Sequence, residues 1–301
     1  MVTRIPCGRF QLTYRGAPLI MGVLNVTPDS FSDGGLHLDP AQAIRHAQQL
    51  ITEGADLIDV GGESTRPGAQ PVSVDEELHR VMPVIEALAK RSPVPLSIDT
   101  SKAEVARQAI AAGASMVNDV TALRGDPQMA AVVARSRASV VLMHMRGRPQ
   151  TMQQAPRYHD VVREVSAFLA DAIHRAQDAG IASARILIDP GLGFGKTVTH
   201  HVLLMHHVEE LVKLGYPVVI GPSRKSFLGR ILEAPVHERL AGTLACVAFA
   251  MQHGVQIVRV HDVKPVAQFV TMWKVLNDAY PSGGQRRSRR HRQASPVRVF
   301  A

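Results

Sequence analysis

The chain has 301 residues, of which 46% are hydrophobic and only 4% are aromatic, so aliphatic side chains must fill its core. This length fits one large α/β domain or two domains of average size. Charged residues make up 20% of the sequence, and this composition excludes a chain that is disordered throughout. The two cysteines, Cys7 and Cys246, lie far apart, which argues against a disulfide framework or a cysteine metal site.

The positive charge of the chain is concentrated in one segment. Residues 281–301 hold six arginines and no acidic residue, so the other 280 residues carry only +2 of the net charge of +8. The body of the protein is therefore nearly balanced, and its charge does not indicate a nucleic-acid partner. The apolar run at 18–24 is too short for a signal peptide or a membrane span. Together with the low cysteine content, this favours a cytoplasmic protein.

One pattern repeats along the chain: a short apolar run ends in polar or glycine-rich residues, and an amphipathic stretch follows. Continuous apolar runs indicate strands buried on both faces, and the alternation of strands with helices indicates parallel pairing. Eight such units predict a single-domain (β/α)8 TIM barrel. The alternative, an open doubly wound sheet, would concentrate its ligand contacts at one switch point. The predicted strands are Leu19–Asn25, Ala55–Gly61, Val94–Asp99, Ser115–Asp119, Ser139–His144, Arg185–Asp189, Pro217–Gly221 and Gln256–His261.

The remaining segments divide into helices and two terminal extensions. We expect residues 1–17 to form an N-terminal extension or hairpin, residues 18–281 the barrel, and residues 282–301 a basic, disordered tail. No second domain is predicted. The predicted helices are Pro40–Glu53, Val74–Lys90, Lys102–Ala112, Asp160–Gly180, His200–Leu214, Glu238–Gln252 and Val263–Asp278.

Polar residues end nearly all of the eight apolar runs, and a TIM barrel gathers such strand ends around one mouth. Asp99, Asn118 and Asp189 each end a run. Several acceptors around one cavity suit a flat heterocycle with adjacent N–H donors, because a carboxylate pairs with such an edge through two parallel hydrogen bonds. The alternative for each aspartate is a helix-capping role.

A second group of residues suits an anion. After the seventh run, Ser223 precedes two adjacent cations, Arg224 and Lys225, and in TIM barrels the loops after the last two strands frequently bind phosphate. Arg259 and His261 end the eighth run, where strand alternation sends both to the same side. These residues predict an anion site, and the alternative for Arg224 and Lys225 is a solvated charge pair.

Three further motifs allow more than one interpretation. Asn25 offers a neutral oxygen suited to Mg²⁺, or it is the capping residue of an ordinary turn. Residues 189–197 contain three glycines and Lys196, but the spacing does not match a phosphate-binding P-loop, which leaves a glycine-rich loop beside a substrate. Four histidines fall on one predicted helix, which we expect to lie at the surface: His200, His201, His206 and His207.

Taken together, these motifs resemble the dihydropteroate synthase family over about residues 18–280. The most specific stretches run from Met21 to Gly34 and from Gly54 to Gly68. Further agreement comes from Leu142–Gln153, Asp189–Lys196, Ser223–Gly229 and Arg259–Asp262. The resemblance implies a transferase of folate biosynthesis. Its reaction would join 6-hydroxymethyl-7,8-dihydropterin pyrophosphate to p-aminobenzoate, giving 7,8-dihydropteroate and pyrophosphate.

The resemblance also implies roles for individual residues. The loops at 26–36 and 63–72 would close over the substrates, and the family is usually dimeric. Asn25, Lys225, Arg259 and His261 would be the catalytic residues. The pterin ring would contact Asp99, Asn118, Asp189 and Lys225. The pyrophosphate would contact Asn25, Arg259 and His261, with Mg²⁺ on Asn25. The p-aminobenzoate would contact Thr65, Arg66, Pro67, Phe194, Ser223 and Lys225.

One position departs from the family pattern, and other functions remain open. Pro222 stands where the family usually has a small residue or threonine, and proline removes an N–H next to Ser223. We therefore also consider a sulfonamide-insensitive variant with the same reaction. A barrel that binds methyltetrahydrofolate and transfers its methyl group is a second alternative, although it needs no pyrophosphate site. A non-catalytic folate-binding barrel is a third.

Overall fold

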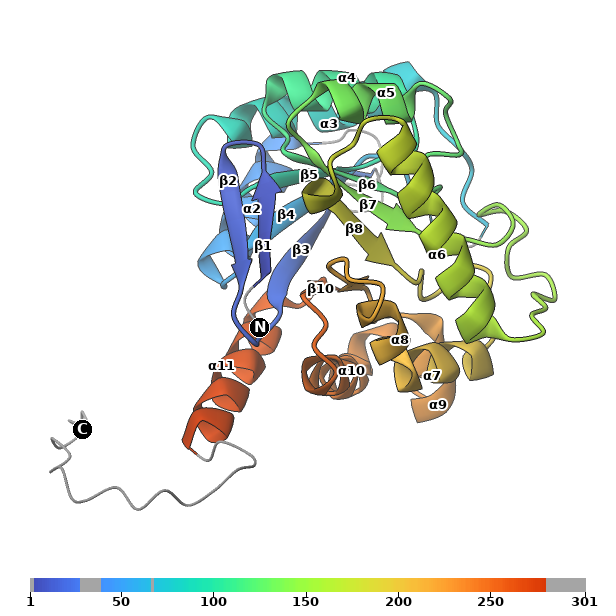
Figure 1. The fold of residues 1–301 in the computed structure, drawn as a ribbon. Helices are drawn as coiled ribbons and strands as arrows, with labels where there is room; N and C mark the ends of the chain where they lie inside the picture. The colour runs from blue at the N-terminus through green and yellow to red at the C-terminus, as the bar shows by residue number, and fades with distance from the viewer. Residues whose placement is uncertain (1–2, 28–38, 66–67, 280–301) are drawn as a thin grey trace, which may run out of the picture.

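The computed structural model describes residues 3–27, 39–65 and 68–279, and Figure 1 shows their arrangement. Eight parallel strands lie in the order β8-β7-β6-β5-β4-β3-β10-β9. A parallel bridge between Ile188 and Val218 connects the two ends of this order, so the sheet is a nearly closed barrel. The predicted TIM barrel is thus confirmed over the open sheet. The strands are β3 Leu19–Asn25, β4 Leu57–Gly61, β5 Leu96–Asp99, β6 Met116–Asp119, β7 Ser139–Met143, β8 Ile186–Asp189, β9 Val219–Ile220 and β10 Ile257–Val260.

Helices surround the strands (Figure 1), and most lie where the sequence predicts them. The predicted helix at 200–214 is two helices, because His207 leaves helical geometry with φ −108° and ψ 29°. Two short helices, α5 and α9, are not predicted, since about two turns are too few to show a periodic pattern. The helices are α2 Pro40–Thr52, α3 Val74–Ala89, α4 Ala103–Ala112, α5 Met129–Arg135, α6 Val161–Asp178, α7 Val198–His206, α8 Val208–Val212, α9 Ser226–Leu232, α10 Leu240–Gln252 and α11 Val263–Ala279.

Polar caps and glycines fix where several helices begin and end. The side chain of Asp160 accepts hydrogen bonds from the backbone N–H groups of Val162 and Arg163, both at 3.0 Å, and so begins α6. Ser73 begins α3 in the same manner. Gly113 ends α4 with a φ of 119°, which a residue with a Cβ rarely adopts. These helices therefore return the chain to the next strand at defined residues.

Side chains alternate between the inside and the outside of the barrel. The outward residues of the strands, such as Ile20 and Ile58, pack beneath the helices in the main hydrophobic core. The inward residues at the beginning of the strands, such as Met21 and Leu57, form a second cluster with Ile5 of the N-terminal segment. Positions two and four residues beyond Met21 share its inward direction, so the polar strand ends face the interior at the opposite rim.

Residues 3–14 form an antiparallel hairpin of β1 Thr3–Cys7 and β2 Phe10–Tyr14. Ser139, the first residue of β7, donates a hydrogen bond from its hydroxyl to the carbonyl of Pro6 in β1. The hairpin therefore covers the N-terminal ends of the barrel strands. In this fold, ligands bind at the other end of the barrel, at the C-terminal ends of the strands. Within the described ranges, none of the helices has both the length and the apolarity that crossing a membrane requires. The predicted tail at 282–301 lies outside the described residues.

Candidate active site

The strand ends place four inward positions in one row. Strand pairing aligns Asn25 with Gly61, Gly61 with Asp99, and Asp99 with Asn118. Paired residues of parallel strands point to the same face, so all four face the interior of the mouth. A Cβ built on Gly61 would lie 3.5 Å from the Cβ of Asp99, so the glycine leaves room beside this carboxylate. The predicted gathering of Asn25, Asp99 and Asn118 is therefore present.

Arg259 connects two buried carboxylates across this row. Its Nε donates to Oδ2 of Asp59 at 2.6 Å, and its Nη2 donates to Oδ2 of Asp99 at 2.8 Å. The amide of Asn118 donates to the same Asp59 oxygen at 3.0 Å. The resemblance assigns Arg259 to the pyrophosphate, whereas in the structure its guanidinium binds Asp99 of the predicted pterin site and the neighbouring Asp59. Its contact with a phosphate stays a prediction.

Asp59 is the site residue that the sequence reasoning missed. Its side chain is fully buried and accepts hydrogen bonds from both Arg259 and Asn118. The available signal was a charged residue inside the apolar run Leu57–Gly61, two positions before Gly61 and therefore on the same inward face. A buried charge in a strand almost always has a compensating group nearby.

Burial raises the pKa of Asp99 to about 7. The positive charge of Arg259 opposes this rise, while the neighbouring charges of Asp59 and Glu77 add to it. Burial also disfavours the charge on Arg259, but Asp59 and Asp99 outweigh that effect and raise its pKa. Among the described residues, Oδ1 of Asp99 has no hydrogen-bond partner although it is buried. This oxygen is therefore available to a ligand with N–H groups.

The last residue of β8 supplies a third carboxylate, and the loop after it supplies an aromatic wall. Asp189 accepts a hydrogen bond from the backbone N–H of Gly191 at 2.6 Å, and burial raises the pKa of its carboxyl. The ammonium nitrogen of Lys225 lies 4.5 Å from the ring centre of Phe194, within cation–π distance. Phe194 belongs to a small apolar cluster that also contains Val120, Met143, Met145 and Met152. A flat ring could therefore lie between this wall and the carboxylates.

The predicted anion site is only partly assembled. Ser223 and His261 are in contact: the backbone N–H of His261 donates to Oγ of Ser223 at 3.2 Å, and the ring Nδ1 lies 3.1 Å from the same oxygen. Arg224 instead forms an ion pair with Asp262 at 2.6 Å and is about half exposed. This geometry agrees with the alternative of a charge pair for Arg224.

A small cavity of about 130 Å³ brings the loop after β4 to the same rim. It is bordered by Glu63, Ser64 and Thr65 on one side and by Asp99 and Met145 on the other. Thr65 therefore borders the same cavity as Asp99, and its predicted contact with p-aminobenzoate stays a prediction. Arg66, Pro67 and most of the loop at 26–36 lie outside the described residues.

Lys102 binds the beginning of the loop after β4. Its ammonium group forms ion pairs with Glu63 and with the fully buried Glu77 of α3, the latter at 2.5 Å. Arg80 of α3 donates to the carbonyl of Gly62 at 2.8 Å. Two helices thus hold the chain in place just before Thr65, which fixes the direction in which the loop leaves β4.

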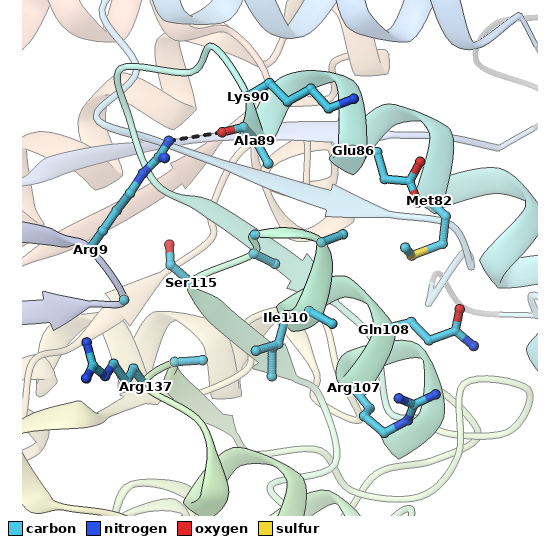
Figure 2. A pocket seen from close by; sticks show the side chains of 16 residues that line it. Arg9, Met82, Glu86, Ala89, Lys90, Arg107, Gln108, Ile110, Ser115 and Arg137 are labelled. Carbon is cyan, nitrogen blue, oxygen red and sulfur yellow. Dashed lines mark hydrogen bonds between the residues drawn. The ribbon is translucent and has the colours of Figure 1, made fainter.

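A larger cavity of about 810 Å³ lies at the opposite end of the barrel, beside the hairpin (Figure 2). Arg9, Lys90 and Arg137 line it, and Arg9 donates to the carbonyl of Ala89 at 3.0 Å. None of the predicted site residues borders this cavity. TIM barrel enzymes have their active sites at the C-terminal ends of the barrel strands. We therefore assign the active site to the smaller cavity, of about 130 Å³, at that end.

The expectation of a histidine-rich surface helix is wrong for His201. This residue is buried, its ring stacks on Phe227 with centres 4.7 Å apart, and its Nε2 accepts a hydrogen bond from the backbone N–H of Gly193 at 2.7 Å. Burial lowers the pKa of His201 to about 4. It therefore supports the loop after β8 as a neutral side chain.

Comparison with known proteins shows the family of the chain. The sequence model of a family described as pterin binding enzyme matches residues 21–261. A dihydropteroate synthase of Escherichia coli K12 is 49% identical over 251 residues, which are 83% of this chain and 89% of that protein. The solved structure of Xanthomonas albilineans dihydropteroate synthase with 4-aminobenzoic acid is 48% identical, with a TM-score of 0.87 over 93% of this chain and all of that one.

A second structure of the Xanthomonas albilineans enzyme, in complex with 7,8-dihydropteroate, is 45% identical, with a TM-score of 0.83 over 92% of this chain and 100% of that chain. The fold, the carboxylate-lined mouth and the family match together define a pterin-binding (β/α)8-barrel enzyme. Within that class, the chain belongs to the dihydropteroate synthase family.

Proposed function

We propose that the protein transfers the dihydropterin-methyl group of 6-hydroxymethyl-7,8-dihydropterin pyrophosphate to the amino group of p-aminobenzoate. The products are 7,8-dihydropteroate and pyrophosphate. One observation carries this proposal: buried carboxylates line the mouth, and Asp99 retains an acceptor oxygen that no described residue uses. Such a group suits the N–H edge of a pterin ring. The similarity to dihydropteroate synthases, one of them solved in complex with 7,8-dihydropteroate, supports the same substrates.

The pterin ring would pair with acidic and amide groups and stack against the apolar wall. Asp99 and Asp189 would accept hydrogen bonds from the ring and its amino group, and Asn118 would orient Asp59. Lys225, above Phe194, would donate to a ring acceptor and add positive charge near the reacting carbon. These groups are fixed before the substrate arrives, so they require little reorganisation.

In the reaction, the bond between the exocyclic methylene carbon and the pyrophosphate oxygen breaks, and its electrons leave with the pyrophosphate. The amino nitrogen of p-aminobenzoate then bonds to that carbon and loses a proton to solvent or to the leaving group. An aniline nitrogen is already nucleophilic, so no strong base is needed. Ser223, His261 and Arg259 would stabilise the departing charge, while Thr65, Arg66, Pro67 and Phe194 would orient the aromatic acid.

Magnesium is part of the proposal, with Asn25 as its ligand. The described residues contain no group of three or more His, Cys, Asp or Glu side chains placed to hold a metal. Asn25 lies half-buried at the rim, and its oxygen fits a Mg²⁺ that takes its other ligands from substrate phosphate and water. The bound ion would offset the charge of the leaving pyrophosphate. Replacing Asn25 by alanine should weaken the Mg²⁺-dependent binding of pyrophosphate, measured by calorimetry.

We also propose that the protein is a homodimer. Large apolar side chains are exposed on α7, α9 and α11, all of which contact α10. Exposed apolar surface that is shared between neighbouring helices often marks a protein–protein interface. The exposed side chains include Leu203, Ile231, Leu232, Met272, Val275 and Leu276. Sedimentation equilibrium should give about twice the chain mass of 32.6 kDa, and Leu232→Glu should shift the measured mass toward that of the monomer.

Both cysteines are free thiols, which is consistent with the predicted cytoplasmic location.

The decisive experiment measures pyrophosphate released by the purified chain from the pterin pyrophosphate. We expect release that depends on p-aminobenzoate and that Asp99→Ala and Lys225→Ala abolish. Transfer of a methyl group from methyltetrahydrofolate without pyrophosphate chemistry would support the methyltransferase alternative instead. No release with any aromatic amine acceptor would leave the enzymatic proposal without support.

A further inference from the structure

The loop between β8 and α7 folds tightly against the end of β7. Gly191, Gly193 and Gly195 all have positive φ values, of 69°, 91° and 63°. A Cβ on Gly191 would lie 1.9 Å from the carbonyl oxygen of His144, and one on Gly195 would lie 2.2 Å from that of Arg146. Only glycine permits these approaches. The alternating glycines turn the backbone so that several of its carbonyl groups face inward.

Lys196 occupies the space that these carbonyl groups enclose. Only 2% of this residue is exposed. Its Nζ lies 3.0 Å from the carbonyl oxygens of Gly191 and Phe194 and 2.9 Å from Nδ1 of His144. An ammonium group has three N–H donors, and the three shortest contacts use all of them. Two loop carbonyls and the ring of His144 therefore take the place of water around the ammonium group.

The protonation states around Lys196 follow from burial. Burial lowers the pKa of Lys196 to about 7, with Lys225 and Arg146 acting in the same direction and Asp189 against it. Burial and the charge of Lys196 lower the pKa of His144 to about 2. His144 is therefore neutral, and its Nδ1 accepts a hydrogen bond from the lysine. Among the contacts described here, the ammonium reaches only loop and strand-end atoms.

Other contacts show that the loop is held from several sides. Gln153 donates to the carbonyl of Gly193 at 2.7 Å, and the hydroxyl of Tyr158 donates to that of Gly195 at 2.9 Å. Lys196 donates to the carbonyls of Gly191 and Phe194 in the same loop. Gly191 in turn donates to Asp189, so the ammonium lies between a predicted pterin carboxylate and the predicted aromatic wall.

We propose that Lys196 is a positioning residue: its ammonium group holds the 190–196 loop in the conformation that presents Phe194 to the aromatic acid. This inference rests on the proposed function. It assigns Lys196 no contact with substrate, because its three donors are used within the loop. Loss of the ammonium would release the carbonyl of Phe194 and turn the aromatic ring away from the second-substrate site.

The test uses Lys196→Met, which keeps the length of the side chain and removes the three donors. We expect a folded enzyme whose KM for p-aminobenzoate rises by at least about tenfold, because small displacements of binding groups have large effects. The KM for the pterin pyrophosphate should change far less. The matched control is Lys213→Met, which removes an exposed lysine at the C-terminal end of α8 and should leave both constants unchanged.

A double-mutant cycle separates positioning from a purely structural role. If Lys196 acts through Phe194, then Lys196→Met should add little to the KM effect of Phe194→Ala. Independent, multiplicative effects, or a wild-type KM for p-aminobenzoate in folded Lys196→Met, would overturn the inference. If Lys196→Met does not fold, His144→Leu removes one of the three acceptors, and it should raise the same constant by a smaller factor. An unchanged constant there would also overturn it.

The same assay distinguishes this inference from the proposed function. Wild-type protein that releases no pyrophosphate in the presence of p-aminobenzoate would refute the proposed reaction. Active wild-type protein with unaffected lysine variants would refute only the role of Lys196.

Discussion

Replacing Gly191 by alanine should damage both stability and activity, and its two physical causes can be separated. The first cause is backbone strain, because Gly191 has a φ of 69°. A residue with a Cβ in this left-handed region costs about 1–2 kcal/mol. The second cause is a clash. The new Cβ would meet the carbonyl oxygen of His144 at 1.9 Å, whereas ordinary contact begins at 3.4 Å, so the loop must move by about 1.5 Å.

Gly215→Ala is the matched control for the strain alone. Gly215 has a similar φ of 83°, but no atom lies within 4 Å of the position of its Cβ. We therefore expect Gly215→Ala to lower the free energy of unfolding by about 1–2 kcal/mol. Gly191→Ala adds an overpacking cost of about 1–3 kcal/mol, for a total loss of about 2–5 kcal/mol. Urea unfolding monitored by circular dichroism measures both losses.

The activities of the two variants should differ more than their stabilities. A displacement of the 190–196 loop moves Phe194, and it also moves the backbone N–H of Gly191, from which Asp189 accepts a hydrogen bond. Misplacement of binding groups by about 1 Å can cost about 10²-fold in rate, so kcat/KM of Gly191→Ala should fall by that order. Gly215→Ala should stay within about twofold of wild type. Equal stability and activity in the two variants would refute the reasoning, since the clash would then have no consequence.

Three further predictions follow from the rim. Because burial raises the pKa of Asp99 to about 7 and a protonated carboxyl loses acceptor capacity, kcat/KM for the pterin substrate should fall as pH drops below 7. A pH profile without an inflection there, or one that Asp99→Asn leaves unchanged, would contradict this role. Lys102→Met leaves Glu77 as an unpaired buried charge, so it should cost about 3–5 kcal/mol in urea unfolding, and adding Glu77→Gln should restore part of that loss. Pro222→Thr should change the KM for p-aminobenzoate and the inhibition by sulfonamides in parallel, and unchanged values of both would dismiss a special role for this proline.

The barrel and the direction of the site residues could be predicted because they depend on short-range pattern. A continuous apolar run buries both faces of a strand, and each run places its last polar residue at the same rim. Strand alternation then assigns Asp99, Asn118 and Asp189 to the interior. The short helices α5 and α9 could not be predicted, because about two turns are too few to show a helical period in the sequence.

Contacts between long side chains could not be predicted in the same way. Alternation places Arg259 inside the mouth, but its flexible stem lets the guanidinium reach either a phosphate or a carboxylate. The outcome depended on Asp59, two strands away around the barrel, which pairs with it in the structure. His201 is similar: the sequence predicts its helix, but only the fold brings Phe227 and Gly193 against its ring.

The same pairing explains how the mouth can hold several buried acids before substrate binds. The charge of Asp59 adds to the rise in the pKa of Asp99, and two buried carboxylates without a nearby cation would favour protonation over ionisation. Arg259 donates one hydrogen bond to each of them, so its single positive charge offsets part of their combined negative charge, and Oδ1 of Asp99 still has no partner among the described residues. A pterin that binds this oxygen would complete hydrogen bonds that the protein leaves unmade. In the free enzyme this oxygen is already buried and has no hydrogen-bond donor in the described part of the chain. A substrate that offers N–H donors at this position therefore gains a hydrogen bond without first displacing water from the oxygen.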